Sequence, residues 1–391
     1  MKHLKKIATF TVSLFFLAAC QKETQLTPAT ASVIPEEVPA NAQNFDEGNE
    51  FGGGQKRVYT LSNQVNGNTV MVYDRAADGM ITFNAAYPTG GTGTGGGLGN
   101  QGAVILGEDD DILLAVNPGS NSISSFKVTN SGLSLKSTVS SGGMRPVSIT
   151  QSDDIVYVLN AGGSGNISGF KIDDDELIPI PNSTRPLSSA SAGAAEIAFV
   201  NDGKVVVITE KATNKIITYT INEWGVPGLM HSITSATPTP FGFDAGKNGN
   251  IFVSEAAGGA AGASKLSSYR VYNNGAISLI TGSVGANQSA ACWVVITDNG
   301  KYAYTTNTAS NNLSNFNVNK STGVINVNTA IAATTGAGPI DAALSNNSHF
   351  LYVLNSGGHS IGVYSVAVNG SLGSVQTVTG LPNGATGLAA K

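Results

Sequence analysis

Two glutamates stand at positions where a recurring strand pattern of this chain otherwise ends in asparagine or serine. The seven strand ends are Ser62, Asn117, Asn160, Glu210, Glu255, Asn307 and Asn355. A third carboxylate, Glu196, begins a strand in the same repeat as Glu210. Carboxylates that share a site raise one another's pKa, which suits them to accept and donate protons. We therefore predict acid–base chemistry at Glu196, Glu210 and Glu255.

Other repeats place a cation and further polar side chains at the corresponding strand beginnings. Arg145 is predicted to complete the catalytic group, because a cation can stabilise a developing oxyanion. The predicted ligand-binding residues are Gln101, Trp293, Asp341 and Asn307. Two alternatives stay open for the three glutamates. They could hold a hard cation together with carbonyl oxygens, or they could form a solvated rim with structural ion pairs.

These residues belong to a unit that recurs seven times. Each copy has a β-branched or aromatic strand, a short polar loop and a second strand that ends in Phe or Tyr. Equivalent positions in the first strand are Tyr59, Leu114, Tyr157, Val207, Phe252, Tyr304 and Tyr352, spaced by 43 to 55 residues. Four short strands per unit at this period predict an all-β, seven-bladed β-propeller. Helical solenoids are excluded, because no 3.6-residue periodicity is present.

The two ends of the repeat array predict how the ring closes. The first copy lacks the inner strand that precedes every other copy, and residues 384–390 supply a spare one. We predict that this C-terminal strand pairs into the first blade, which removes exposed strand edges. In such a ring the inner strands begin, and the second strands end, on one face beside the central channel. Concave mouths of this kind are common ligand sites, so the residues named above are expected to converge there.

The N-terminus reads as a targeting segment. Three lysines precede an apolar run over residues 7–17, which is shorter than the roughly 20 residues of a transmembrane helix. The run ends in Leu17-Ala18-Ala19-Cys20, which resembles the lipobox of bacterial lipoproteins. We predict a signal peptide over residues 1–19, a lipidated Cys20 with a flexible tether over 20–55, and the propeller over 56–391. Because Gln21 follows the cysteine, the resemblance implies an outer-membrane lipoprotein; the alternative is an ordinary signal peptide.

Composition and motifs limit the function classes. The net charge is −5 and only 12% of residues are charged, so nothing resembles the basic surface of a nucleic-acid-binding protein. GxSxG, HExxH and CxxC are absent, and the chain has four histidines. We predict no cofactor and no metal site. The expected partner is a small polar ligand or a surface partner, with membrane contact through the lipid alone and a monomeric state.

The strand pair Tyr157-Val158-Leu159-Asn160 and Ile167-Ser168-Gly169-Phe170 resembles the seven-bladed lactonase-type propellers. That family includes 6-phosphogluconolactonases, fungal carboxymuconate-cyclising enzymes and the YVTN repeats of surface-layer proteins. The resemblance extends over residues 57–391. Segments such as Gly97-Leu98-Gly99-Asn100-Gln101, Phe252-Val253-Ser254-Glu255-Ala256 and Cys292-Trp293-Val294 are similar to a bacterial branch of this group. The resemblance implies binding of a small ligand, with lactone hydrolysis as the reaction.

The chain departs from the family where the known chemistry would lie. A Gly-Pro-Arg-His step and an Asn-Glu step of true phosphogluconolactonases correspond here to Ala194-Ala195-Glu196 and Glu210-Lys211. Only Arg145 and Lys211 are available to meet a phosphate, which argues against classical 6-phosphogluconolactonase activity. Two functions stay open. One is a ligand-binding propeller, with or without hydrolysis, at the channel mouth, and the other is a non-catalytic interaction module of YVTN-repeat type. A deep pocket with close carboxylates favours the first, and an open solvated rim favours the second.

Overall fold

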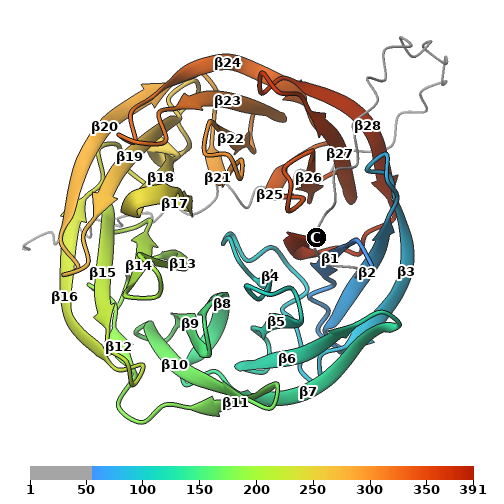
Figure 1. Cartoon of the computed structure of the whole chain (residues 1–391), viewed down its shortest axis with the longest axis vertical. Coiled ribbons are helices and arrows are strands. Elements are labelled where there is room, and N and C mark those ends of the chain that lie inside the picture. Colours follow the sequence, from blue (N-terminus) through green and yellow to red (C-terminus); the bar gives the residue numbers. More distant parts are fainter. Residues whose placement is uncertain (1–54) are drawn as a thin grey trace, which may run out of the picture.

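The computed structural model describes residues 55–391, which form a closed ring of seven antiparallel sheets (Figure 1). In each blade the strands run from the axis to the rim. The first three blades consist of β29 (Thr386–Ala390), β1 (Arg57–Leu61), β2 (Thr69–Arg75) and β3 (Ile81–Pro88); β4 (Val104–Leu106), β5 (Ile112–Asn117), β6 (Ser122–Thr129) and β7 (Gly132–Ser140); and β8 (Met144–Ser152), β9 (Ile155–Gly162), β10 (Asn166–Asp173) and β11 (Glu176–Pro179). A short strand, β12 (Arg185–Pro186), also pairs with β10.

The other four blades repeat this arrangement. They consist of β13 (Ala194–Val200), β14 (Val205–Glu210), β15 (Lys215–Ile221) and β16 (Pro227–Thr234); β17 (Pro240–Ala245), β18 (Asn250–Glu255), β19 (Lys265–Val271) and β20 (Ile277–Gly285); β21 (Ala291–Ile296), β22 (Tyr302–Asn307), β23 (Asn312–Val318) and β24 (Ile325–Thr334); and β25 (Pro339–Leu344), β26 (Phe350–Asn355), β27 (Ser360–Val366) and β28 (Leu372–Thr379). The helical elements of the described residues are two 3-10 turns, η1 (Lys247–Gly249) and η2 (Ala257–Gly259). Within residues 55–391, no helix has the length and apolar character needed to cross a membrane.

The seven-bladed ring and its predicted closure are confirmed. The C-terminal strand β29 pairs antiparallel with β1, so the first blade is built from both ends of the described chain. The predicted signal peptide, Cys20 and all of the tether except Gln55 lie outside the described residues, so lipidation and the outer-membrane location stay predictions.

The core lies between neighbouring blades, because both faces of each inner strand are covered. The second strand of the fourth blade, β14, is buried along its whole length, whereas the outer strand β16 exposes most of its residues. The recurring tyrosine of the repeat also joins blades. The hydroxyl groups of Tyr157, Tyr304 and Tyr352 donate to turn carbonyls of the next blade, at Gly225, Gly370 and Gly79.

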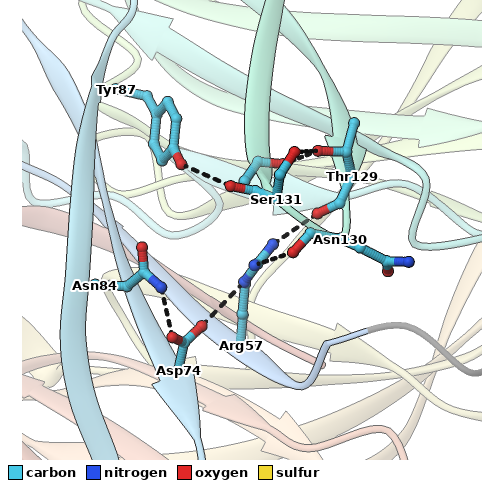
Figure 2. Close-up of polar contacts among 8 residues, drawn as sticks. Arg57, Asp74, Asn84, Tyr87, Thr129, Asn130 and Ser131 are labelled. Atoms are coloured by element: carbon cyan, nitrogen blue, oxygen red, sulfur yellow. Dashed lines mark hydrogen bonds and ion pairs between the residues drawn. The ribbon is translucent and has the colours of Figure 1, made fainter.

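The seam between the first two blades is held by Arg57, at the start of β1 (Figure 2). Its guanidinium donates to the carbonyls of Thr129 and Asn130, at 2.7 Å each, and pairs with Asp74 at 3.1 Å. Asn84 donates to the other oxygen of Asp74. Arg57 is 3% exposed, so its contacts are shielded from water. They hold β1, the strand with which β29 pairs to close the ring.

Candidate functional site

A segment from the second blade crosses the central channel. We call residues 98–102, which precede β4, the plug segment, and Figure 1 shows the chain before β4 extending toward the axis. Asn100 donates to the carbonyls of Ala194 and Ala195 in the fourth blade. The side-chain amide of Gln101 both donates to and accepts from the backbone of Val294 in the sixth blade, at 2.9 and 3.1 Å. The plug segment therefore joins blades on opposite sides of the ring.

The crossing depends on a glycine and a tryptophan. Gly242 lies beside Gln101, and a Cβ atom at that position would stand 2.2 Å from Gln101 Oε1. The indole of Trp293 donates to the carbonyl of Asn100 at 3.2 Å and is itself 1% exposed. The structure shows Gln101 and Trp293 holding the plug segment in place, and their predicted role in ligand binding stays a prediction.

A cavity of about 910 Å³ lies on one side of the plug segment, over the third to fifth blades. Leu98, Gly99 and Asn100 contribute one wall. The rest is lined mainly by small apolar residues of the loops that enter and leave the inner strands. They include Ala161, Leu187, Ala192, Ala194, Ala212, Phe241 and Ala256. The volume falls within the range that accommodates small-molecule ligands.

The charged side chains that line this cavity are both cations. Lys211 follows directly after β14, and its Nζ atom donates to the Gly99 carbonyl at 2.6 Å and lies 4.5 Å from the centre of the Phe241 ring. Burial first, and the positive charge of Arg145 second, lower the pKa of Lys211 to about 7. A lysine is therefore held here with its amine near half-protonation at neutral pH.

Arg145 reaches the cavity from β8 with its backbone in the left-handed region, at a φ of 54°. Its amide donates to Asn121 at 2.7 Å, which fixes this turn. Across residues 55–391 its guanidinium forms no ion pair, and no Asp or Glu of that range lines the cavity. The charge that the cavity presents to a ligand is therefore positive.

Glu210 is buried and serves the backbone around the cavity. Its carboxylate accepts hydrogen bonds from the amide of Ser188 at 2.8 Å, from the Ser188 hydroxyl, and from the Thr213 hydroxyl at 2.5 Å. Ser188 lies in the loop that enters β13, and that loop provides five cavity-lining residues, from Leu187 to Gly193. Glu210 therefore positions one cavity wall and is not among the lining residues.

Glu255 plays a similar part in the fifth blade. Its two oxygens accept hydrogen bonds from Ser267 at 2.7 Å and Tyr269 at 2.8 Å. Burial raises its pKa, and these hydrogen bonds, with others from Thr237, oppose the rise. Thr237 precedes Pro238 and Thr239, which line the cavity. Glu255 thus also connects a strand end to the loop that enters the same blade.

A comparison of Asn160 with Glu210 shows one reason why a glutamate can replace an asparagine at this register. Asn160 donates its amide to the carbonyl of Ser141, in the loop that enters the third blade. In the fourth blade the equivalent loop offers donors from Ser188, so a carboxylate acceptor fits where an amide donor does not. In these two blades the residue at the strand end thus matches the hydrogen-bonding group that the entering loop presents.

The remaining predicted residues are also bonded within the fold. Asn307 donates to Asn312 and Ser314 at 2.8 Å each and is 1% exposed. Asp341 accepts from its neighbour Ala342 at 2.9 Å, and its second oxygen has no hydrogen-bond partner among the described residues. Burial raises the pKa of Asp341 well above its ordinary range.

Glu196 caps the free inner edge of the next blade. Its carboxylate accepts from the amide of Phe243 at 2.6 Å, and Asp244 does the same for Ile296 at 2.8 Å. Burial is the main cause that raises the pKa of Glu196 well above its ordinary range, and it raises the pKa of Asp244 to about 6. These carboxylates satisfy backbone amides that the innermost strands leave unpaired.

We predict that Glu196→Gln is more stable than the parent protein at pH 8. The folded-state pKa of Glu196 is raised, so its neutral form is favoured in the fold. The protonated Glu196 contributes its full stabilisation of the fold below the pKa that glutamate has in the unfolded chain, about 4.3. This stabilisation is lost as pH rises through the pKa of Glu196 in the folded protein. Glutamine keeps the acceptor for Phe243 without the buried charge. Thermal melts from pH 4 to 8 should show a gain that disappears toward pH 4, and a loss of stability at pH 8 would contradict this.

The predicted convergence of three carboxylates with Arg145 is therefore not what the cavity contains. Of the eight predicted site residues, Arg145 alone lines it. Glu196, Glu210, Glu255 and Asp341 are buried within the blades, and their catalytic or ligand-binding roles stay predictions without a shared pocket. Between residues 55 and 391, no three His, Cys, Asp or Glu side chains are grouped to hold a metal, which leaves the hard-cation alternative without support.

Lys211 is the residue whose importance sequence reasoning missed. It was considered only as a cation that could meet a phosphate. Its position next to Glu210, at a strand end that faces the channel mouth, was the available signal. Its burial against Phe241 and Gly99 could not be read from sequence, because both partners lie in other blades or in the plug segment.

A closed ring of seven blades, six of four strands and one with an added fifth strand, defines a seven-bladed β-propeller. The chain belongs to the family described as lactonase, 7-bladed beta-propeller, which it matches over residues 49–178 and 273–386. The residues between these two segments include Lys211, Glu210 and most of the cavity lining. Most of the cavity lining thus lies outside the two segments that match the family, whereas Arg145 lies inside the first of them.

Solved structures share the fold at low sequence identity. A provisionally assigned 6-phosphogluconolactonase of Bacteroides fragilis is 15% identical, with a TM-score of 0.68 over 86% of this chain and 98% of its own. The periplasmic gluconolactonase PpgL of Pseudomonas aeruginosa is 14% identical, with a TM-score of 0.63 over 85% and 99%. None of the curated protein sequences compared with the chain matches it significantly.

Proposed function

We propose that this protein binds a small sugar acid or its lactone in the cavity beside Lys211 and Arg145, and hydrolyses the lactone form. The observation that carries the proposal is a cavity with two cationic side chains and no carboxylate in its lining. Unpaired cations beside apolar walls favour an anionic ligand of small size, because charge-assisted hydrogen bonds are stronger there than in water. Family membership and the similarity in fold to a gluconolactonase support a lactone as substrate.

The cavity's own residues can supply the chemistry of lactone opening. Lys211 in its neutral form can accept a proton from a water molecule that attacks the acyl carbon, and a pKa of about 7 suits this near neutral pH. Arg145 can stabilise the oxyanion that develops as the carbonyl is attacked. The ring C–O bond then breaks, and protonated Lys211 returns its proton to the leaving ring oxygen. The product is a hydroxy acid, which loses its carboxyl proton to solvent and whose carboxylate the cations can hold.

Thermal shift with D-gluconate and turnover of D-glucono-δ-lactone test this proposal. We expect Lys211→Met to weaken gluconate binding about tenfold or more, since one charge-assisted hydrogen bond is lost. Gluconate affinity of the parent protein should fall as pH rises through about 7, because Lys211 then loses its charge. Lys204→Met is the matched control, since Lys204 is exposed in the same blade and does not line the cavity.

Equal affinity in Lys211→Met and the parent protein would reject the site. A panel should also include 6-phosphogluconate, which reports whether the cations prefer a phosphate. If no sugar acid or lactone shifts the melting temperature, the alternative of a non-catalytic interaction module becomes the better account.

A further inference from the structure

We propose that Lys211 forms an imine with the carbonyl carbon of a small 2-oxo acid whose carboxylate is held by Arg145. This inference rests on the anion-binding cavity proposed above, and it assigns a second, covalent capability to that site. Lysines that act as nucleophiles are desolvated in apolar surroundings or placed beside another cation. Lys211 meets both conditions, since it lies over Phe241 and shares the cavity with Arg145.

The contacts of Lys211 leave its amine available. Its hydrogen-bond acceptor is a neutral carbonyl, that of Gly99, and the acidic residue beside it in the chain, Glu210, is occupied by Ser188 and Thr213. Lys211 pairs with no carboxylate in residues 55–391 that would hold the ammonium form. The neutral amine is therefore populated near neutral pH, whereas an exposed lysine has a pKa of about 10.4.

The cavity also suits a short acid. Alanine side chains at positions 192, 194, 212 and 256 line it together with the two cations, so a compact ligand can lie against an apolar wall while its polar groups meet Lys211 and Arg145. A 2-oxo acid places a carboxylate next to its carbonyl carbon. Its carboxylate can pair with the exposed guanidinium of Arg145 while the carbonyl faces the lysine.

Imine formation needs no reactant other than Lys211 and the 2-oxo acid. The nitrogen lone pair of neutral Lys211 attacks the carbonyl carbon, a C–N bond forms, and the π electrons of the carbonyl move to its oxygen. A proton passes from nitrogen to that oxygen to give a carbinolamine. Loss of one water molecule then gives the imine, which takes up a proton from solvent.

Reductive trapping tests the proposal. The purified protein is incubated with pyruvate and sodium cyanoborohydride, and adducts are located by intact mass and peptide mapping. We expect a single adduct at Lys211, with a rate that is half-maximal near pH 7. The exposed lysines Lys204 and Lys320 are internal controls and should react only at higher pH. Lys211→Arg should abolish the adduct.

Arg145→Gln tests the role of the second cation. Loss of the Arg145 charge raises the pKa of Lys211 and slows trapping of both carbonyl compounds near neutral pH. Trapping of pyruvate should slow about tenfold or more beyond the slowing of acetaldehyde, which has no carboxylate to lose contact with Arg145. An unmodified Lys211 in folded protein, or adducts spread evenly over surface lysines, would overturn the inference. Equal slowing of both carbonyl compounds in Arg145→Gln would also count against it. Gluconate binding without a pyruvate adduct would reject this inference alone, and an adduct without gluconate binding would reject the sugar-acid proposal alone.

Discussion

Removal of residues 384–391 is expected to lower the melting temperature by about 10 °C or more, because it opens the ring. The deletion removes β29, the inner strand of the first blade, and exposes β1 as a free edge. Burial of Leu388 and Ala389 is lost as well. Together these amount to about 5 kcal/mol of unfolding free energy, and a domain of this size shifts by about 2 °C per kcal/mol.

Polar contacts add to this effect. Thr60 donates its hydroxyl to the Gly387 carbonyl at 2.7 Å, and Arg75 donates to the Lys391 carbonyl at 3.0 Å. Deletion leaves both side chains, which are buried, without these partners. A buried donor left without an acceptor lowers the free energy of unfolding by more than a hydrogen bond normally contributes, because its desolvation is no longer compensated.

A pair of glycine variants separates ring closure from chain length. Gly387 and Gly380 both have positive φ, at 74° and 95°. A Cβ on Gly387 would stand 2.9 Å from the backbone of Val104, whereas Gly380 has nothing within 4 Å. Gly387→Ala should therefore destabilise more than Gly380→Ala, as measured by thermal and denaturant melts. A deletion protein that melts like the parent would refute the closure argument.

The second large effect is expected for Glu210→Ala, at about 3 kcal/mol of unfolding free energy. The substitution leaves the Ser188 amide and hydroxyl and the Thr213 hydroxyl without their shared acceptor, and Glu210 itself is fully buried. Because that loop lines the cavity from Leu187 to Gly193, gluconate binding should weaken as well, although Glu210 does not line the cavity.

Two controls sharpen this prediction. Glu223→Ala removes an exposed glutamate from the same blade and should change stability by less than about 0.5 kcal/mol. Glu210→Gln keeps one acceptor and places an amide donor against the donors of Ser188 and Thr213, so its loss should be intermediate. If Glu210→Gln is fully stable but loses turnover of D-glucono-δ-lactone, Glu210 acts in chemistry and not in positioning.

The architecture was predictable because its signals are local. Alternating strands, turn residues and a spacing near 50 residues recur in every copy, and a propeller is the sum of such units. Even the closure through residues 384–390 followed from counting strands, because one unit lacked an inner strand and one end of the chain had a spare. The role of the repeated tyrosines is visible only in the structure, where their hydroxyl groups donate to turn carbonyls of the next blade.

The amino-acid sequence by itself determined the blades, their number, the closing strand and the register at which Glu210 and Glu255 replace asparagine. The tertiary structure decided what those carboxylates do. Their register places them at the channel end of a strand. Ser188 of an entering loop donates to Glu210, and Ser267 and Tyr269 of β19 donate to Glu255, so both buried carboxylates anchor neighbouring segments. The same packing brings Gly99 and Phe241, which are far apart in sequence, against Lys211 and lowers its pKa. Desolvation depends on neighbours from several blades at once, so no single segment of sequence could reveal it.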